Sequence, residues 1–249
     1  DIIITVRERK QTVNPLLTER NFMETQKIDR RKSYFITFDT ETANSIDCPL
    51  MYDLGFAVHD KQGNVYETFS FVIADIYCDE RELMKSAYYA EKLPQYEIGI
   101  KAGQRKIVSA ETAKRILAET ARKYNVKAII AHNARFDYKS TANTIRYITK
   151  SKIRYFLPYG VPLWDTLEMA KSVIKNKPTY KNFCEKKGYF TKNGQVRLTA
   201  EILYQFISGE EDFIEKHQGL EDVLIEKEIF QYCIRQHKKM KRSPWKEED

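Results

Sequence analysis

The chain has 249 residues, of which 42% are hydrophobic and 31% charged, a composition typical of globular proteins that fold in water. No apolar run approaches the roughly 20 residues that a membrane-spanning helix needs, and the N-terminus lacks the basic and apolar regions of a secretory signal. We therefore expect no membrane association and a cytoplasmic location. The formal net charge of +7 favours an anionic partner.

The four cysteines lie far apart in the sequence, at Cys48, Cys78, Cys184 and Cys233. None of them forms a C-x-x-C pair, which argues against a zinc site. Reduced thiols in a cytosolic protein are the expected state.

Residues 1–32 are polar and charged, and we expect them to form an N-terminal arm before the folded domain. Three stretches rich in aromatic and β-branched residues follow, at 34–39, 52–58 and 65–72, and they predict strands. The turn-rich segment 60–64 predicts a hairpin between the last two. Three successive antiparallel strands are therefore expected to open the sheet.

The middle of the chain mixes helical and extended patterns. Residues 79–92 are predicted to be helical, and residues 93–107 to form an irregular connection. Ser109 is a suitable N-cap for a helix that runs to about Tyr124. The short apolar run 128–131 is typical of a buried central strand.

Five more helices are expected toward the C-terminus, at 136–148, 166–174, 179–187, 199–207 and 220–238. The predicted elements begin with strands and continue with strands mixed with helices. This order predicts an α/β fold in which helices flank a mixed central sheet. We expect one domain over residues 33–238 and a charged, loosely held tail over residues 239–249.

Two acidic residues, Asp39 and Glu41, end the first predicted strand. Because side chains alternate along a strand, both carboxylates point to the same face. They repel each other unless a cation lies between them, and a divalent metal ion suits this role. The pattern is weak by itself, because many strand ends carry two acidic residues.

The segment 132–137, His-Asn-Ala-Arg-Phe-Asp, follows the predicted buried strand. The exit from such a strand into a helix is where α/β folds bind ligands. Asp137 then lies in the first turn of a helix, where compensation of the helix dipole is the alternative explanation for an acidic residue.

The segment 217–222, His-Gln-Gly-Leu-Glu-Asp, precedes the last long helix. On one continuous helix, residues five positions apart lie about 140° apart and do not share a face. Gly219 instead predicts that His217 lies in the approaching loop and Asp222 in the helix, so that both side chains reach one point. A surface histidine and an ordinary acidic residue of a first helical turn are the alternatives.

Together these segments resemble the motifs of the DnaQ-like 3′→5′ exonucleases, a family that includes proofreading epsilon subunits and small exoribonucleases. Residues 39–42 resemble the first motif, usually D-x-E-T-T-G, and residues 132–137 the second, H-N-A-x-F-D. Residues 217–222 resemble the third, H-x-A-L-x-D, of the histidine-bearing DEDDh subgroup. Asp165-Thr166-Leu167 resembles the D-T-L that commonly lies between the second and third motifs.

The chain departs from the family pattern in three places. Ala43-Asn44 replaces the usual T-G, a change that we expect to affect how the loop approaches a terminal nucleotide. Gly219 replaces the usual alanine, which we expect to be harmless. Residues 73–108 form a longer segment than compact members carry, suited to substrate handling or to a partner.

The resemblance implies a ribonuclease-H-like fold and hydrolysis by a two-metal mechanism with Mg²⁺ or Mn²⁺. It implies that Asp39 bridges both ions, that Glu41 and Asp222 complete one ion site, and that Asp137 supports the other. His217 would be the general base. The residues expected to bind substrate are Thr40, Thr42, Asn133 and Phe136.

The substrate implied by the resemblance is a single-stranded or frayed 3′ end of DNA, and a polymerase or another replication or repair protein is compatible as a partner. The 3′ ends of RNA or short oligoribonucleotides are the alternative substrate, since no residue can be assigned to a 2′-OH. A non-catalytic nucleic-acid-binding domain is the alternative from another class. It is disfavoured because all four carboxylates and the histidine are present.

A basic stretch, residues 139–192, holds twelve Lys and Arg against three acidic residues, a local charge of +9. Aromatic residues such as Tyr147, Tyr155 and Tyr159 lie among them. This mixture suits phosphates and stacked bases, and a solvated surface is the alternative.

Overall fold

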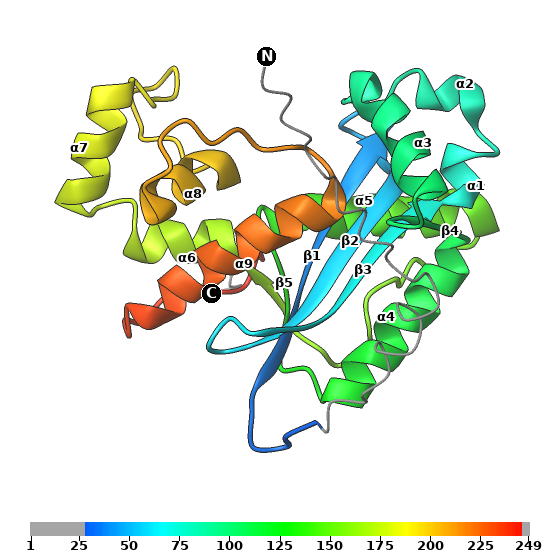
Figure 1. The fold of residues 1–249 in the computed structure, drawn as a ribbon, viewed down its shortest axis with the longest axis horizontal. Helices are drawn as coiled ribbons and strands as arrows, with labels where there is room; N and C mark the ends of the chain where they lie inside the picture. Colours follow the sequence, from blue (N-terminus) through cyan, green and yellow to red (C-terminus); the bar gives the residue numbers. More distant parts are fainter. Residues whose placement is uncertain (1–27, 246–249) are drawn as a thin grey trace, which may run out of the picture. The chain divides into compact units, whose positions relative to one another are not determined.

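The core of the computed structural model is a six-stranded sheet in the order β4-β3-β2-β1-β5-β6 (Figure 1). The strands are β1 Tyr34–Ala43, β2 Leu50–Asp60, β3 Val65–Ile73, β4 Lys106–Val108, β5 Ile129–Ala131 and β6 Leu163–Asp165. β1, β2 and β3 pair antiparallel, whereas β4 runs parallel to β3, β5 to β1 and β6 to β5. The predicted α/β fold, with a mixed central sheet flanked by helices, is confirmed.

The structure describes residues 28–245. The sheet and all of the helices described below lie between residues 31 and 245. The predicted N-terminal arm therefore lies almost wholly outside the described residues. Within the described part, no helix is both long enough and apolar enough to cross a membrane.

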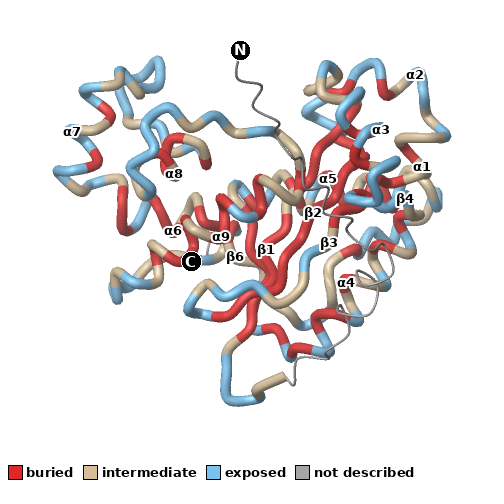
Figure 2. Tube along the Cα trace, in the orientation of Figure 1, coloured by how far each residue is buried: buried red, intermediate tan, exposed pale blue. Residues whose placement is uncertain are grey.

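The first two strands form the buried centre of the molecule (Figure 2). Every residue of β2 is buried, and so is every residue of β1 except Asp39. Their aromatic and branched side chains suit a pleated surface covered on both faces. β3 is exposed over its first half and buried over its last four residues.

Helices cover both faces of this centre. They are α1 Ala74–Tyr77, α2 Arg81–Met84, α3 Leu93–Lys101, α4 Ala110–Tyr124, α5 Ala134–Thr149, α6 Thr166–Val173, α7 Pro178–Lys187, α8 Ala200–Ser208 and α9 Gly219–Arg235. α9 crosses one face of β1 and β2, and α5 crosses the other (Figure 1). α6, α7 and α8 pack with α9 and with residues of β1 and β5 in one apolar cluster.

The segment between β3 and β4, residues 74–105, differs from the sequence-based prediction, and we call it the inserted segment. The single helix expected at 79–92 is instead one short helix, α2, and a 3-10 turn, Ala90–Lys92. The connection expected at 93–107 contains α3, with Pro94 in its first turn, where the missing N–H of proline costs nothing. Proline there marks the start of a helix and not a loop.

The prediction of a loosely held tail is wrong for its described residues, 239–245. The amide of Asp165 donates to the carbonyl of Arg242 at 2.7 Å. The Arg242 guanidinium lies 4.6 Å from the ring centroid of Trp164, and Lys241 pairs with Glu168 at 3.2 Å. The charges of the tail therefore attach it to β6 and α6.

Candidate active site

A cavity of about 670 Å³ brings the three motif segments together at the end of β1 and the starts of α5 and α9. All five predicted catalytic residues line it: Asp39, Glu41, Asp137, His217 and Asp222. Of the predicted substrate-binding residues, Thr40, Asn133 and Phe136 line the cavity. Thr42 is buried nearby and is not part of the lining.

Asp137 is held in place by the end of β1. Its Oδ1 accepts hydrogen bonds from the Thr40 amide at 3.2 Å and from the Thr40 hydroxyl at 2.8 Å. Asn133, in the left-handed conformation with φ 61°, turns the chain from β5 into α5, a backbone conformation that asparagine tolerates. Its amide donates to Asp165 Oδ1 at 3.0 Å, so the D-T-L aspartate fixes the turn that carries Asp137.

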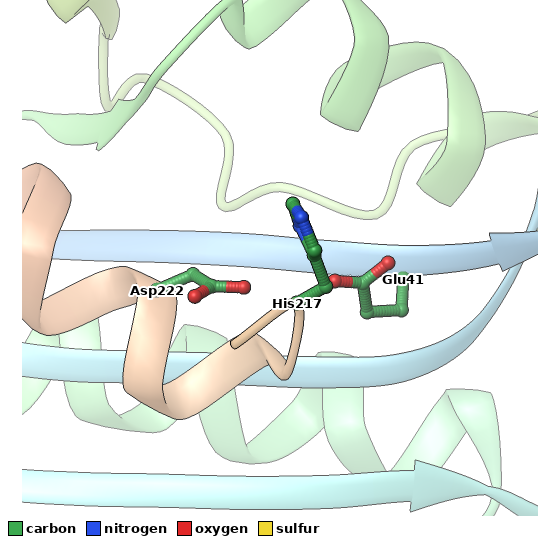
Figure 3. Close-up of side chains that lie close together, drawn as sticks. All are labelled: Glu41, His217 and Asp222. Atoms are coloured by element: carbon green, nitrogen blue, oxygen red, sulfur yellow. The ribbon is translucent and has the colours of Figure 1, made fainter. Parts of the chain in front are cut away.

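The loop before α9 delivers His217 and Asp222 as the sequence predicts. His217 has φ 54°, and α9 begins at Gly219. The Gln218 amide donates to Asp222 Oδ2 at 2.8 Å, which leaves the buried Oδ1 without a hydrogen-bond partner among the described residues. Glu41, His217 and Asp222 each offer one atom that could bind a metal ion, and these three atoms lie within 4.8 Å of one another (Figure 3).

Two of the departures from the family pattern now have a structural explanation. Asn44 has φ 71°, so asparagine occupies, at the place of the usual glycine, a conformation that most residues avoid. Gly219, at the place of the usual alanine, lies where the start of α9 contacts β2. A Cβ on Gly219 would lie 2.7 Å from the Gly55 nitrogen, so this chain has no room for the usual alanine.

His217 stacks on Tyr89 of the inserted segment, with ring centroids 3.9 Å apart and planes at 9°. Burial lowers the pKa of His217, partly offset by the charge of Glu201. Its Nδ1 lies 4.0 Å from Glu215 Oε2. The sequence gives no signal for Tyr89 or Glu215, because both lie in segments without a motif.

The carboxylates of the cavity favour their protonated forms when no cation is bound. Burial, followed by the charge of Asp222, raises the pKa of Glu41 to about 9. Burial and the charge of Glu215 raise the pKa of Asp222 to about 8. Burial also raises the pKa of Asp137 to about 7, although hydrogen bonds from Thr40 oppose this shift. Desolvation and like charge both disfavour ionised carboxylates, and a bound cation reverses both effects.

The residues present fit a divalent metal ion. Carboxylate oxygens are the ligands that Mg²⁺ and Mn²⁺ prefer, and Asp222 offers a buried oxygen with no described partner. Glu226 adds a further carboxylate to the cavity, four residues after Asp222 and therefore on the same face of α9. It is only 3% exposed, and its Oε2 has no described partner. In the sequence, the spacing of four residues between Asp222 and Glu226 is the signal that could identify Glu226 as a site residue.

Cations line the other side of the cavity, at Lys171, Lys175 and Arg197. Only the first two belong to the basic stretch predicted from sequence. Lys150 and Lys152, in the loop after α5, are exposed and do not line the cavity.

Comparison with known proteins gives a structural likeness only. No family model matches the sequence, and no curated protein matches it. The fold is similar to that of S. pombe Pop2p in its Mg²⁺- and Mn²⁺-bound form, at 14% identity over 80% of this chain and 81% of Pop2p, with a TM-score of 0.45. It is also similar to E. coli exonuclease I in complex with a 5cy-dT13 oligonucleotide, at 15% identity over 83% of this chain, with a TM-score of 0.45.

Exonuclease I from Methylocaldum szegediense matches at 12% identity over 82% of this chain, with a TM-score of 0.43. The chain spans about two fifths of the length of these two exonuclease I chains.

Proposed function

We propose that this protein is a metal-dependent 3′→5′ exonuclease that hydrolyses phosphodiester bonds from the 3′ end of DNA. The observation that supports the proposal is the meeting of Asp39, Glu41, Asp137, His217 and Asp222 in one cavity. They come from three segments that are far apart in the sequence and that match, in order, the motifs of one nuclease family. A domain with a purely structural role gains nothing from so many buried carboxylates.

Asp39, Glu41, Asp137 and Asp222 would hold two divalent cations, Mg²⁺ or Mn²⁺, with Asp39 shared between them as the motif resemblance implies. When bound, the two ions would stabilise the negative charge that gathers on the phosphodiester oxygens and would lower the pKa of a water molecule. Thr40 would keep Asp137 oriented through its two hydrogen bonds.

His217 would accept the proton of the attacking water. Its lowered pKa keeps the imidazole neutral at pH 7 and therefore able to act as a base. The stacked ring of Tyr89 limits rotation of the imidazole, so that its nitrogen atoms face a constant direction. Asn133 and Phe136 would contact the terminal nucleotide, and Lys171 and Lys175 would attract its phosphates.

The test is digestion of 5′-labelled single-stranded DNA, duplex DNA and RNA of one sequence, each with Mg²⁺, Mn²⁺ or EDTA. We expect a ladder that shortens from the 3′ end, with single-stranded DNA degraded fastest and no cleavage in EDTA. Circular single-stranded DNA, which has no end, should survive.

Each other outcome of this assay has a distinct meaning. Faster digestion of RNA would make the protein an exoribonuclease. Cleavage of the circle would make it an endonuclease, and no cleavage with either metal ion would leave a non-catalytic binding domain.

A further inference from the structure

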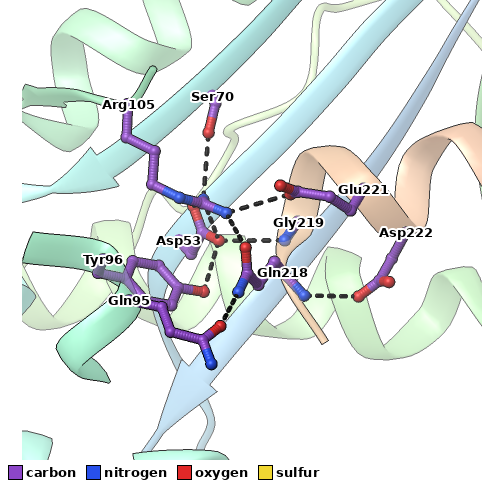
Figure 4. Close-up of polar contacts among 9 residues, drawn as sticks. All are labelled: Asp53, Ser70, Gln95, Tyr96, Arg105, Gln218, Gly219, Glu221 and Asp222. Carbon is purple, nitrogen blue, oxygen red and sulfur yellow. Dashed lines mark hydrogen bonds and ion pairs between the residues drawn. The ribbon is translucent and has the colours of Figure 1, made fainter. Parts of the chain in front are cut away.

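A buried polar cluster that takes no part in the proposed chemistry lies directly beneath the start of α9 (Figure 4). We call it the Asp53 cluster, and it consists of Asp53, Tyr96, Arg105, Gln218 and Glu221. Asp53 and Tyr96 are fully buried, and Arg105 is only 6% exposed. Asp53 pairs across the sheet with Glu41, so the cluster adjoins the candidate site.

Asp53 holds the first amide of α9. Its Oδ2 accepts hydrogen bonds from the Gly219 amide at 3.1 Å, the Tyr96 hydroxyl at 2.7 Å and Arg105 at 3.0 Å. The N-cap residue of α9, Gln218, makes no side-chain capping bond of its own. A strand residue therefore does what an N-cap side chain ordinarily does for the unpaired amides of a helix start.

Arg105 connects this strand to the loop that carries His217. One guanidinium nitrogen binds Asp53, and the other donates to Gln218 Oε1 at 2.8 Å and to Glu221 Oε2 at 3.1 Å. The planar fork of arginine can bind two elements at fixed angles, which lysine cannot do. Since the Gln218 amide donates to Asp222, the contacts run without a break from β2 to a proposed metal ligand.

The backbones of β2 and of the start of α9 are closely packed at this point. A Cβ on Gly55 would lie 2.2 Å from the carbonyl carbon of Gly219, so β2 and the start of α9 are in direct contact. Gly55 and Gly219 determine how closely α9 approaches the sheet, and the Asp53 cluster determines the direction of α9.

Buried ion pairs are a poor source of stability, because removing two charges from water costs as much as their attraction returns. We propose that Asp53 and Arg105 are positioning residues, which fix the loop and first turn of α9 and thereby hold His217 and Asp222 against Glu41. This inference rests on the proposed function for its catalytic consequence. It assigns a role to the inserted segment, which supplies Tyr96 and Arg105.

The variant Gln218→Ala tests this proposal at the loop, because it removes the acceptor that Arg105 binds there. It leaves intact the buried Asp53–Arg105 pair and the bond from Arg105 to Glu221 in the first turn of α9. Gln236→Ala is the matched control: Gln236 lies at the other end of α9, where its side chain binds Lys177. We expect Gln218→Ala to lower kcat by roughly 10- to 100-fold, as a displacement of about 1 Å can, with KM changed less than about twofold. Gln236→Ala should retain wild-type kcat.

Two measurements without nucleic acid separate this proposal from the proposed nuclease activity. Mn²⁺ affinity, measured by titration calorimetry, should fall roughly 10- to 100-fold in Gln218→Ala, as is typical when a partner of a metal ligand is removed. Hydrogen exchange should speed up at residues 217–222 and stay unchanged in the rest of α9. Both readouts apply even if the wild type cleaves no nucleic acid.

Arg105→Lys, which keeps the charge and loses the fork, should have the same effects as Gln218→Ala if it folds. The proposal is overturned if Gln218→Ala keeps wild-type Mn²⁺ affinity and wild-type exchange at residues 217–222. It is also overturned if Gln236→Ala lowers Mn²⁺ affinity equally, because the effect would then be a general loosening of α9. With an active wild type, an unchanged kcat in Gln218→Ala overturns it as well.

Discussion

Two turns of this molecule follow the same plan, and we call residues 132–137 the first turn and residues 217–222 the second turn. Each begins with a histidine, leads the chain into a helix and ends in a buried aspartate. Each also contains one residue in the left-handed conformation, Asn133 in the first and His217 in the second.

The two turns differ in how their polar groups are occupied. In the first, His132 bonds through both ring nitrogens, to Thr166 at 2.9 Å and to the Leu198 carbonyl at 2.8 Å. Burial lowers its pKa to about 4, so it remains neutral. In the second, Asp222 Oδ1 has no hydrogen-bond partner among the described residues, and the ring of His217 stacks on Tyr89 and lies 4.0 Å from Glu215 Oε2.

This difference shows how one sequence pattern serves two purposes. The histidine of the first turn is bound into the structure, whereas the second turn leaves its imidazole and Asp222 Oδ1 available for ligands. Within the second turn Asp222 holds only the Gln218 amide, and further contacts come from outside the turn, from Asp53, Arg105 and Gly55.

The largest effect is expected from Asp222→Asn. Asparagine can still accept the Gln218 amide bond, but its amide group replaces the free oxygen and cannot bind a metal ion. Activity on single-stranded DNA should fall roughly a thousandfold, because metal stabilisation is worth several kcal/mol and each 1.36 kcal/mol is tenfold in rate. Steady-state rates in Mg²⁺ measure this, and a loss smaller than about tenfold would contradict the assignment.

The same variant has a pH signature without substrate. Because the pKa of Asp222 is raised to about 8, the metal-free folded protein holds a proton that the unfolded chain releases near pH 4. The stability of metal-free wild type should therefore decrease as pH rises from about 4 to 8. Thermal melts in EDTA should show that the stability of Asp222→Asn decreases less over this pH range. An equal decrease in the two proteins would mean that a group other than Asp222 holds the proton.

His217→Ala should bind Mn²⁺ almost normally and turn over roughly a hundredfold more slowly, the usual contribution of a general base. A base works only when deprotonated, so the wild-type rate should fall as pH drops through the lowered pKa of His217, below about 6.5. The variant should lose this dependence, and rate profiles from pH 5 to 8 compare the two. Identical profiles would mean that His217 is not the base.

Replacing Lys171 and Lys175 together by glutamine should raise KM roughly tenfold, since two exposed phosphate contacts contribute up to about 1 kcal/mol each. The slope of log binding constant against log salt should fall in magnitude by about 1.4. Lys150 and Lys152, replaced in the same way, are the matched control outside the cavity. If the control pair gives the larger change, the strand binds along the loop after α5.

The smallest catalytic effect is expected from His132→Ala. Losing the imidazole removes its hydrogen bonds to the Thr166 hydroxyl and to the Leu198 carbonyl, which should lower the free energy of unfolding by about 2 kcal/mol. The rate per folded molecule should stay within about threefold of wild type. Urea unfolding and active-site-normalised rates measure the two, and a catalytic loss as large as that of His217→Ala would abolish the contrast between the turns.

Much of the site could be predicted from sequence because its residues sit at element ends with strong local signals. Asp39 and Glu41 end a clear strand, and Gly219 marks the start of α9. Buried strands long enough to show their pattern, β1 to β3, were predicted within a few residues. β4 and β6 were missed because, unlike the equally short β5, they are mostly exposed or half-buried and lack a continuous apolar run.

The residues that support the site could not be predicted. Arg105 and Tyr96 meet Gln218 and Asp53 across long sequence separations, and nothing local distinguishes a buried arginine from a surface one. The inserted segment appears irregular because its short helices are fixed by contacts with β2 and α5, for example Tyr147 to Glu80 at 2.8 Å. Tertiary contacts, and not propensity, determine such segments.

The contact between Gly55 and Gly219 limits which segments of this chain could be exchanged with those of another protein. A chain with alanine at the position of Gly219 needs extra room on the facing strand, so we expect the two positions to change together. A chimera that took only the 217–222 turn from such a chain would push one methyl group into the backbone of β2. We expect it to regain activity only when the strand around position 55 is transferred with the turn.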